Sequence, residues 1–174
     1  MCGIFGYIGP KSVVPILIEG LKKLEYRGYD SAGIAVADRG RLEVCRVKGK
    51  ISDLEACLAK TSISGSYGLG HTRWATHGRP SEENAHPHQD CTGKIVIVHN
   101  GIIENYLTLK RRLLDEGHKF QTETDTEVIA HLIAKYYAGS LEVAARAAFA
   151  ELEGAFAVAA LSESEPGKIV VAKS

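Results

Sequence analysis

The sequence predicts an α+β protein in which two sheets pack together and helices cover their outer faces. Strand-like runs cluster at both ends and in the middle of the chain, and stretches of helical periodicity lie between them. The regular strand–helix alternation of a doubly wound sheet is only partly present. The 174 residues suit one compact domain.

Two helices are expected in the first half of the chain. From Ser12, apolar residues recur at helical spacing as far as Leu24, with Pro15 tolerated in the first turn. Arg27-Gly28 closes this helix. A second, shorter helix is expected over 51–58.

Strands are expected around these helices. β-Rich runs at 32–37 and 42–47 flank Asp38-Arg39-Gly40-Arg41, which predicts a hairpin turn. Cys2-Gly3-Ile4 begins another apolar strand. The continuous apolar run at 95–98 is typical of a strand that is covered on both faces.

The second half predicts more helices and the closing strands. Thr124 and Glu127 have the spacing of a capping box before an apolar stripe. The expected elements are helices over 103–114, 124–136 and 141–152 and strands over 155–161 and 169–172. The polar stretch 75–93 breaks this pattern, and so long an irregular segment predicts a functional loop.

Composition limits the classes of function. Lysine plus arginine number 21 and aspartate plus glutamate 21, so the zero net charge argues against binding nucleic acid through charge. The longest apolar stretch, 155–161, is far shorter than the roughly 20 residues that span a bilayer. No secretory signal and no CxxC pair is present, which favours a reducing cytoplasm.

Cys2 is the first candidate for chemistry. Removal of Met1 would put a thiol and an α-amine on one residue, and an amine with a pKa of about 7.7–8.0 can act as a base near neutral pH. The alternative is an incidental buried thiol.

His99-Asn100-Gly101 follows the apolar run at 95–98. A side-chain amide and a backbone N–H placed side by side there can form an oxyanion hole. The alternative is an ordinary turn, because Asn-Gly is a common turn dipeptide.

A third group of residues could hold an amino acid. Arg73 can bind a carboxylate, with hydrogen bonds from Thr76 and His77, and Asp125 can hold an ammonium group. Trp74 begins the irregular loop and could form part of a lid. The alternatives are a surface ion pair for Arg73, a core position for Trp74 and a helix-dipole role for Asp125.

Six motifs occur in one order along the chain. They are Cys2-Gly3-Ile4, Glu25-Tyr26-Arg27-Gly28-Tyr29-Asp30-Ser31-Ala32-Gly33, Arg73-Trp74-Ala75-Thr76-His77-Gly78, Asn84-Ala85-His86-Pro87-His88, His99-Asn100-Gly101-Ile102-Ile103-Glu104-Asn105 and Glu123-Thr124-Asp125-Thr126-Glu127. Together they resemble the glutaminase domains of glutamine–fructose-6-phosphate aminotransferases, which are class II amidotransferases with an N-terminal nucleophile. The resemblance covers residues 1–174 and implies a four-layer αββα sandwich.

The resemblance also implies roles for the candidate residues. Cys2 would attack the side-chain amide of L-glutamine, Asn100 and Gly101 would stabilise the oxyanion, and Arg27 would support the nucleophile. The residues expected to bind the substrate or to order the loop over it are Arg73, Trp74, Thr76, His77, His86 and Asp125.

Beyond this domain, the resemblance implies C-terminal sugar-isomerase domains that use fructose 6-phosphate and receive the ammonia. The chain would then be a fragment that hydrolyses glutamine without making glucosamine 6-phosphate. The full-length enzyme would be a cytoplasmic homodimer. No metal, other cofactor, nucleic acid or membrane partner is expected.

Three alternatives remain. One is the glutaminase domain of another class II amidotransferase, and another is an interaction domain with an inert thiol. The third is a zinc-binding domain or zinc hydrolase, in which His86, His88 and Cys91 supply ligands and His71, His77 or His99 completes the site. The zinc hypothesis lacks a recognised ligand spacing.

Overall fold

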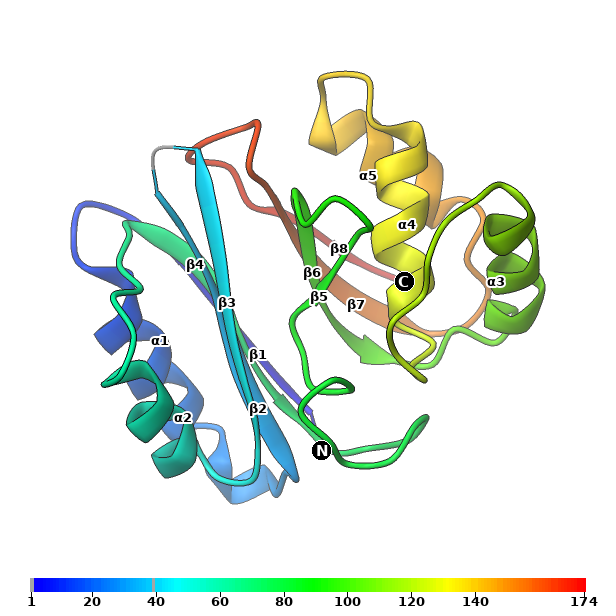
Figure 1. Ribbon diagram of the computed structural model, residues 1–174. Coiled ribbons are helices and arrows are strands. Elements are labelled where there is room, and N and C mark those ends of the chain that lie inside the picture. Colours follow the sequence, from blue (N-terminus) through cyan, green and yellow to red (C-terminus); the bar gives the residue numbers. More distant parts are fainter. Residues whose placement is uncertain (1, 39) are drawn as a thin grey trace.

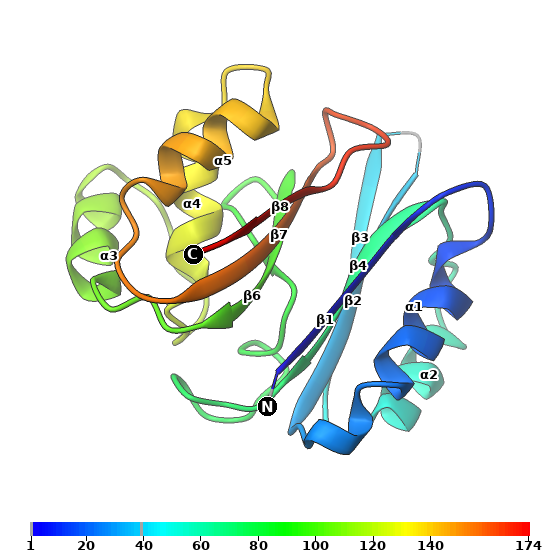
Figure 2. The same cartoon turned by 180° about the vertical axis from the view of Figure 1, so that it is seen from behind.

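A computed structural model of the chain describes residues 2–38 and 40–174. Two four-stranded antiparallel sheets stack face to face, and helices cover the outer face of each (Figures 1 and 2). The first sheet has the order β1 (Gly3–Ile8), β4 (Tyr67–Arg73), β2 (Ser31–Asp38) and β3 (Arg41–Lys48). The second has the order β5 (His88–Gln89), β6 (Ile95–Gly101), β7 (Phe156–Ser162) and β8 (Val170–Lys173).

The helices complete four layers, as the sequence predicts. The helices α1 (Val13–Lys22) and α2 (Ile51–Leu58) lie on the first sheet. Three helices lie on the outer face of the second sheet, turned away from the first (Figure 2): α3 (Tyr106–Asp115), α4 (Glu127–Tyr136) and α5 (Leu141–Phe149). No helix in the described part of the chain is long and apolar enough to span a membrane.

The hydrophobic core has three parts, because successive side chains of each strand point to opposite faces of its sheet. In β2, Ile34 and Val36 face α1 and α2, whereas Ala35 and Ala37 face the second sheet. In β6, Val96 and Val98 lie between the sheets, and Ile95 and Ile97 face the helices. The prediction that the run at 95–98 is covered on both faces is therefore confirmed.

The central strand β4 is the largest element that the sequence pattern missed. It carries two glycines and the polar residues His71, Thr72 and Arg73, yet all seven of its residues are buried. A Cβ atom on Gly68 would lie 2.4 Å from the carbonyl oxygen of Ala35, so the glycine permits close pairing with β2. Because apolar and polar residues do not alternate along β4, the sequence pattern does not predict a strand here.

The hairpin and the element positions are largely as expected. Asp38 pairs with Arg41 at the end of the β2–β3 hairpin, and residue 39 lies outside the described ranges. The first helix ends at Lys22, and a separate 3₁₀ turn, η1 (Glu25–Arg27), continues the chain to Gly28 at φ +75°. The last helix ends at Phe149 rather than at residue 152.

Two predictions about helix starts are wrong. The third helix begins at Tyr106, because the N–H of Ile103 donates to the carboxylate of Asp125 instead of entering a helix. The capping box of Thr124 and Glu127 does not form. The Glu127 carboxylate accepts hydrogen bonds from the N–H groups of Gln121 and Thr122, so it ties down the preceding loop.

Candidate active site

A cavity of about 610 Å³ opens where the start of β1, the ends of β4 and β6, the loop after β4 and the segment before α4 meet. Its lining residues are Cys2, Arg27, Arg73, Trp74, Thr76, His77, His86, His99, Asn100, Gly101, Ile102, Thr124, Asp125 and Thr126. All ten residues that the sequence nominated are among them. Segments distant in sequence therefore converge on one site.

Cys2 lies at the edge of this cavity, just before β1. The backbone N–H of Trp74 donates to its Sγ over 3.2 Å, and the thiol lies 3.6 Å from the carbonyl oxygen of Trp74. The side chain is half-buried, so a small molecule can reach it. The prediction about removal of Met1 concerns a residue outside the described ranges.

Asn100 ends β6 beside Cys2. Its Nδ2 donates to the carbonyl oxygen of Cys2 over 3.4 Å, and its Oδ1 lies 2.9 Å from Nε2 of His71. The same Nε2 lies 3.0 Å from the carbonyl oxygen of His99. Two oxygen partners require the proton on Nε2, so His71 donates to Asn100 and turns the amide N–H groups toward Cys2.

Gly101 follows at φ +122°. A Cβ atom there would lie 2.2 Å from the carbonyl oxygen of Ala155 and 2.9 Å from the Cα of Phe156. The neighbouring strand β7 therefore allows only glycine at this point of the cavity wall.

Arg73 is a buried cation at the end of β4. Its guanidinium donates to the carbonyl oxygens of His77, Gly78 and Arg79 and so holds the loop that follows β4. Among the described contacts these bonds occupy three of its five N–H donors, which leaves capacity for a carboxylate. Burial lowers the pKa of Arg73, and the charges of Asp30, Cys2 and Asp125 oppose that shift.

Asp125 and Thr126 form the opposite wall. Both are buried, and Oδ2 of Asp125 accepts the N–H of Ile103 over 2.8 Å. The hydroxyl of Thr126 lies 2.8 Å from Nδ1 of His99 and 3.1 Å from Nε2 of His86. The wall therefore presents one carboxylate among neutral hydrogen-bonding groups.

Asp30 positions the loop that Trp74 begins. Its Oδ2 accepts the N–H of Ala75 over 2.6 Å, and its own N–H donates to the carbonyl oxygen of Arg73. Trp74 is 55% exposed, and its indole packs over Gly28, where a Cβ atom would lie 2.5 Å from the ring. Arg27, half-buried, precedes this glycine.

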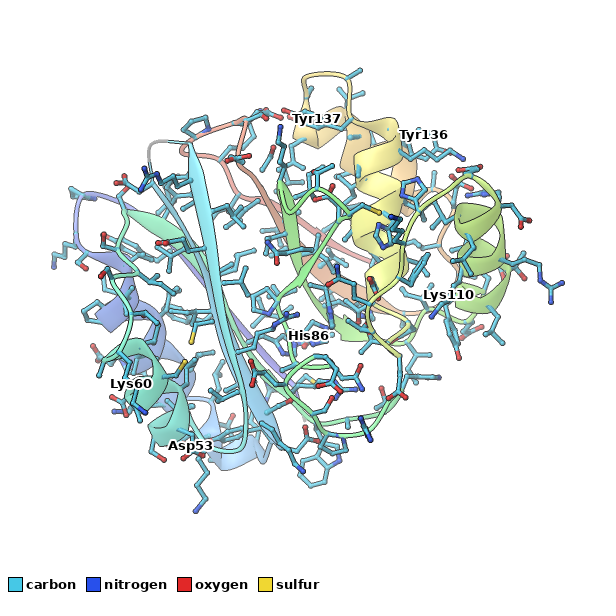
Figure 3. The ribbon with its side chains drawn as sticks, in the orientation of Figure 1. Asp53, Lys60, His86, Lys110, Tyr136 and Tyr137 are labelled. Atoms are coloured by element: carbon cyan, nitrogen blue, oxygen red, sulfur yellow. The ribbon has the colours of Figure 1, made fainter. Side chains whose placement is uncertain are left out.

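Two buried histidines, His71 and His86, pack against each other beside the cavity. His86, labelled in Figure 3, stacks on His71 with ring centroids 4.1 Å apart. Burial lowers the pKa of His71 to about 3 and lowers that of His86 well below its ordinary value, so both rings are neutral at pH 7. His77 lies edge-on to Tyr106, and Thr76 is exposed.

Sequence reasoning missed several residues of the site. His71 and His99 appeared only as alternative metal ligands, and Thr126 was assigned no role. A signal was present for Gly33, which belongs to the second motif. A Cβ atom at Gly33 would lie 2.2 Å from the carbonyl oxygen of His86, so the glycine lets the loop approach β2.

The structure does not assemble the zinc site that was considered as an alternative. The Nε2 atoms of His86 and His88 contact the hydroxyls of Thr126 and Thr124. Cys91 instead contacts His118 and His131, which lie on other segments.

Comparison with known proteins identifies the family of this chain. A model of the glutamine amidotransferase domain matches residues 71–174. The chain is 53% identical over its whole length to a glutamine–fructose-6-phosphate aminotransferase [isomerizing] from Symbiobacterium thermophilum. It is 52% identical over 99% of its length to the protein of that name from Pyrococcus horikoshii. In both cases the chain spans 29% of the relative, less than a third of its length.

Solved structures share the fold. A glutamine phosphoribosylpyrophosphate amidotransferase from B. subtilis superposes with a TM-score of 0.83 and 31% identity, over 98% of this chain and 37% of that one. A class-II glutamine aminotransferase domain protein from Silicibacter pomeroyi has the same fold at 16% identity, with a TM-score of 0.61 over 99% of this chain and 76% of that one. The chain belongs to the glutamine amidotransferase domain family.

Proposed function

We propose that this chain hydrolyses L-glutamine to glutamate and ammonia, with Cys2 as the nucleophile. One observation carries the proposal: the Cys2 thiol, the Asn100 amide, a buried arginine and a buried aspartate line a single cavity. Arg73 would bind the α-carboxylate of glutamine with help from Thr76 and His77. Asp125 would bind the α-ammonium group, which directs the side-chain amide toward Cys2.

The first half of the reaction forms a thioester. The α-amine of Cys2, exposed once Met1 is removed, takes the thiol proton, and Sγ forms a bond to the amide carbon of glutamine. The N–H groups of Asn100 and Gly101 stabilise the oxyanion that develops on the amide oxygen. When the C–N bond breaks, the leaving nitrogen takes the proton back from the amine and departs as ammonia.

The second half hydrolyses the thioester. The Cys2 amine removes a proton from water, and the water oxygen adds to the thioester carbonyl carbon, again with the oxyanion on Asn100 and Gly101. The C–S bond breaks, the thiol regains its proton and glutamate leaves. Trp74 and the loop after it would cover the substrate, with Arg27 and His86 supporting this arrangement.

We further propose that the ammonia serves a sugar phosphate. The supporting observation is the name shared by the curated relatives, of which this chain matches less than a third. In a full-length enzyme, sugar-isomerase domains on the same chain would use the ammonia to convert fructose 6-phosphate to glucosamine 6-phosphate. Such an enzyme would be a cytoplasmic homodimer, and the four free thiols suit a reducing compartment.

The glutaminase proposal is tested by intact-mass measurement before and after treatment with 6-diazo-5-oxo-norleucine, a glutamine-like electrophile. We expect a mass without Met1 and one adduct, located on the Cys2 peptide and prevented by glutamine. Cys57→Ser is the matched control, because it removes another half-buried thiol outside the cavity and leaves labelling unchanged. Met1 absent with no adduct on Cys2 would refute the proposal.

Retention of Met1 is resolved by a second preparation. Cleavage of the chain from a fusion that leaves Cys2 as the first residue supplies the free amine, and labelling is then repeated. The sugar-phosphate proposal has its own test in the full-length enzyme. That enzyme should form glucosamine 6-phosphate from glutamine and fructose 6-phosphate, whereas the 174-residue chain should release only glutamate and ammonia.

A further inference from the structure

A cluster of three metal-binding side chains lies outside the cavity. Cys91 is in the turn between β5 and β6, His118 follows α3, and His131 is in α4; these segments lie side by side in Figure 1. Within residues 2–38 and 40–174, this is the one group of three or more cysteine, histidine or acidic side chains that could hold a metal ion, and its ligand atoms all lie within 4.8 Å of one another. Neither the proposed reaction nor the sequence motifs use it.

The distances suit a tetrahedral ion. Sγ of Cys91 lies 3.5 Å from Nδ1 of His131 and 3.8 Å from Nδ1 of His118. A zinc ion has bonds of about 2.3 Å to sulfur and about 2.0 Å to nitrogen, so tetrahedral angles place sulfur and nitrogen about 3.5 Å apart. Small rotations of the partly exposed His118 ring would complete the geometry.

A second layer of hydrogen bonds already orients the ligands. Nε2 of His131 lies 3.3 Å from Oε1 of Glu127, and both side chains are buried. A carboxylate at Nε2 fixes the proton there and leaves the Nδ1 lone pair directed at Cys91, as in carboxylate–histidine–zinc arrangements. The N–H of Lys119 donates to Sγ of Cys91 over 3.2 Å and so helps to hold the sulfur beside the two rings.

We propose that Cys91, His118 and His131 bind one zinc ion, with a water molecule as the fourth ligand. One thiolate and two imidazoles are the ligand types that zinc prefers over magnesium and calcium. The exposure of Cys91 leaves room for the water. The ion joins the β5–β6 turn and the segment after α3 to α4, so its effect is to stabilise the fold on this side of the second sheet.

Metal binding is measured on the metal-free 174-residue chain in a Cys2→Ala background, which removes the cavity thiol. After dialysis against Zn²⁺, elemental analysis should give one zinc per chain. Co²⁺ should produce a sulfur-to-metal charge-transfer band and the intense visible bands of a tetrahedral site. Zn²⁺ should also raise the melting temperature of the chain.

Variants assign the site. Cys91→Ser should lower the affinity for Zn²⁺ by at least about 100-fold and abolish the charge-transfer band, because loss of a ligand exceeds the 10–100-fold cost of losing an outer hydrogen bond. His118→Gln, at a partly exposed position, should also weaken binding. Cys57→Ser is the matched control: its thiol lies 3.0 Å from that of Cys45, away from the cluster, and binding should be unchanged.

The opposite pattern overturns the proposal. Absence of stoichiometric Zn²⁺ and Co²⁺ binding would leave the cluster as a set of hydrogen bonds. If the Cys91→Ser variant binds Zn²⁺ as tightly as the Cys2→Ala chain, the metal binds to other residues. If Cys57→Ser then abolishes binding, Cys45 and Cys57 are those residues.

Discussion

Nε2 of His71 lies 2.9 Å from Oδ1 of Asn100, and this bond links the centre of the first sheet to the end of β6 in the second. Burial lowers the pKa of His71 to about 3, so the ring is neutral and donates from Nε2. Asn100 is thereby oriented by a residue that does not line the cavity. The proposed oxyanion hole therefore forms only when the two sheets pack so that His71 meets Asn100.

Replacing Asn100 by alanine tests that hole. The Asn100→Ala variant loses an amide donor to the oxyanion, so we expect kcat for glutamine hydrolysis to fall by about 10²–10³ with KM changed little. Steady-state release of glutamate measures both constants. A larger rise in KM than fall in kcat would instead assign Asn100 to substrate binding.

His71→Phe removes the donor while keeping an aromatic ring against His86. We expect kcat to fall by about tenfold, or about 1.4 kcal/mol of transition-state stabilisation, because the amide loses its fixed orientation. In the Asn100→Ala background the same substitution should have little further effect on kcat, since its target is gone. Full additivity in this double-mutant cycle would show that His71 acts on something else.

Asp125→Asn keeps an oxygen for the N–H of Ile103 but removes the charge. We expect KM for glutamine to rise by about 10–100-fold, as a charge-assisted hydrogen bond to the α-ammonium group is lost. The matched substrate is glutaramate, which lacks the amine. The parent chain and the variant should hydrolyse glutaramate equally, and a variant that is equally impaired on both substrates would contradict the assignment.

The sequence patterns predicted most of the fold, because most helices and strands have apolar residues at the spacing typical of their type. The hairpin of β2 and β3, the helix α2 and the buried run in β6 follow such patterns. The strand β4 does not, since it substitutes glycines and polar residues for alternation. Its partners β1 and β2 are far away in sequence, and only tertiary pairing makes it a strand.

For the candidate site, too, the sequence predicted some residues and not others. Motifs nominated Cys2, Asn100 and Asp125, because the types of residue suit the chemistry. Motifs did not reveal that His71 orients Asn100, since residues 29 positions apart meet only when the sheets stack. The cluster of Cys91 with His118 and His131 was missed for the same reason.

Gly101 and Gly117 make a matched pair for stability. Both have positive φ, but a Cβ atom on Gly101 would lie 2.2 Å from the carbonyl oxygen of Ala155, whereas Gly117 has open space. We expect Gly117→Ala to cost about 1 kcal/mol of unfolding free energy and Gly101→Ala more than about 3 kcal/mol, because β7 must move. Urea denaturation measures both, and equal costs would rule out the steric explanation.

Stability should fall as the pH drops below about 6.5. Burial lowers the pKa of His71 and of His88 to about 3 and that of His99 to about 4, the last opposed by the charge of Asp125. The unfolded chain, with histidine pKa values of about 6.5, binds these protons first. The free energy of unfolding is therefore highest above pH 6.5 and declines on acidification, by about 1.4 kcal/mol per pH unit for each histidine.

The variant His88→Gln isolates one of these protons. His88 is buried outside the cavity lining, and a glutamine amide can replace its hydrogen bond with Thr124. Urea denaturation between pH 6.5 and 5.0, above the range in which most carboxylates titrate, should give a slope against pH about 1.4 kcal/mol per unit smaller for the variant. Identical slopes would mean that the folded chain protonates His88 as readily as the unfolded chain does. The ring would then be solvated and not buried between β5 and the segment before α4.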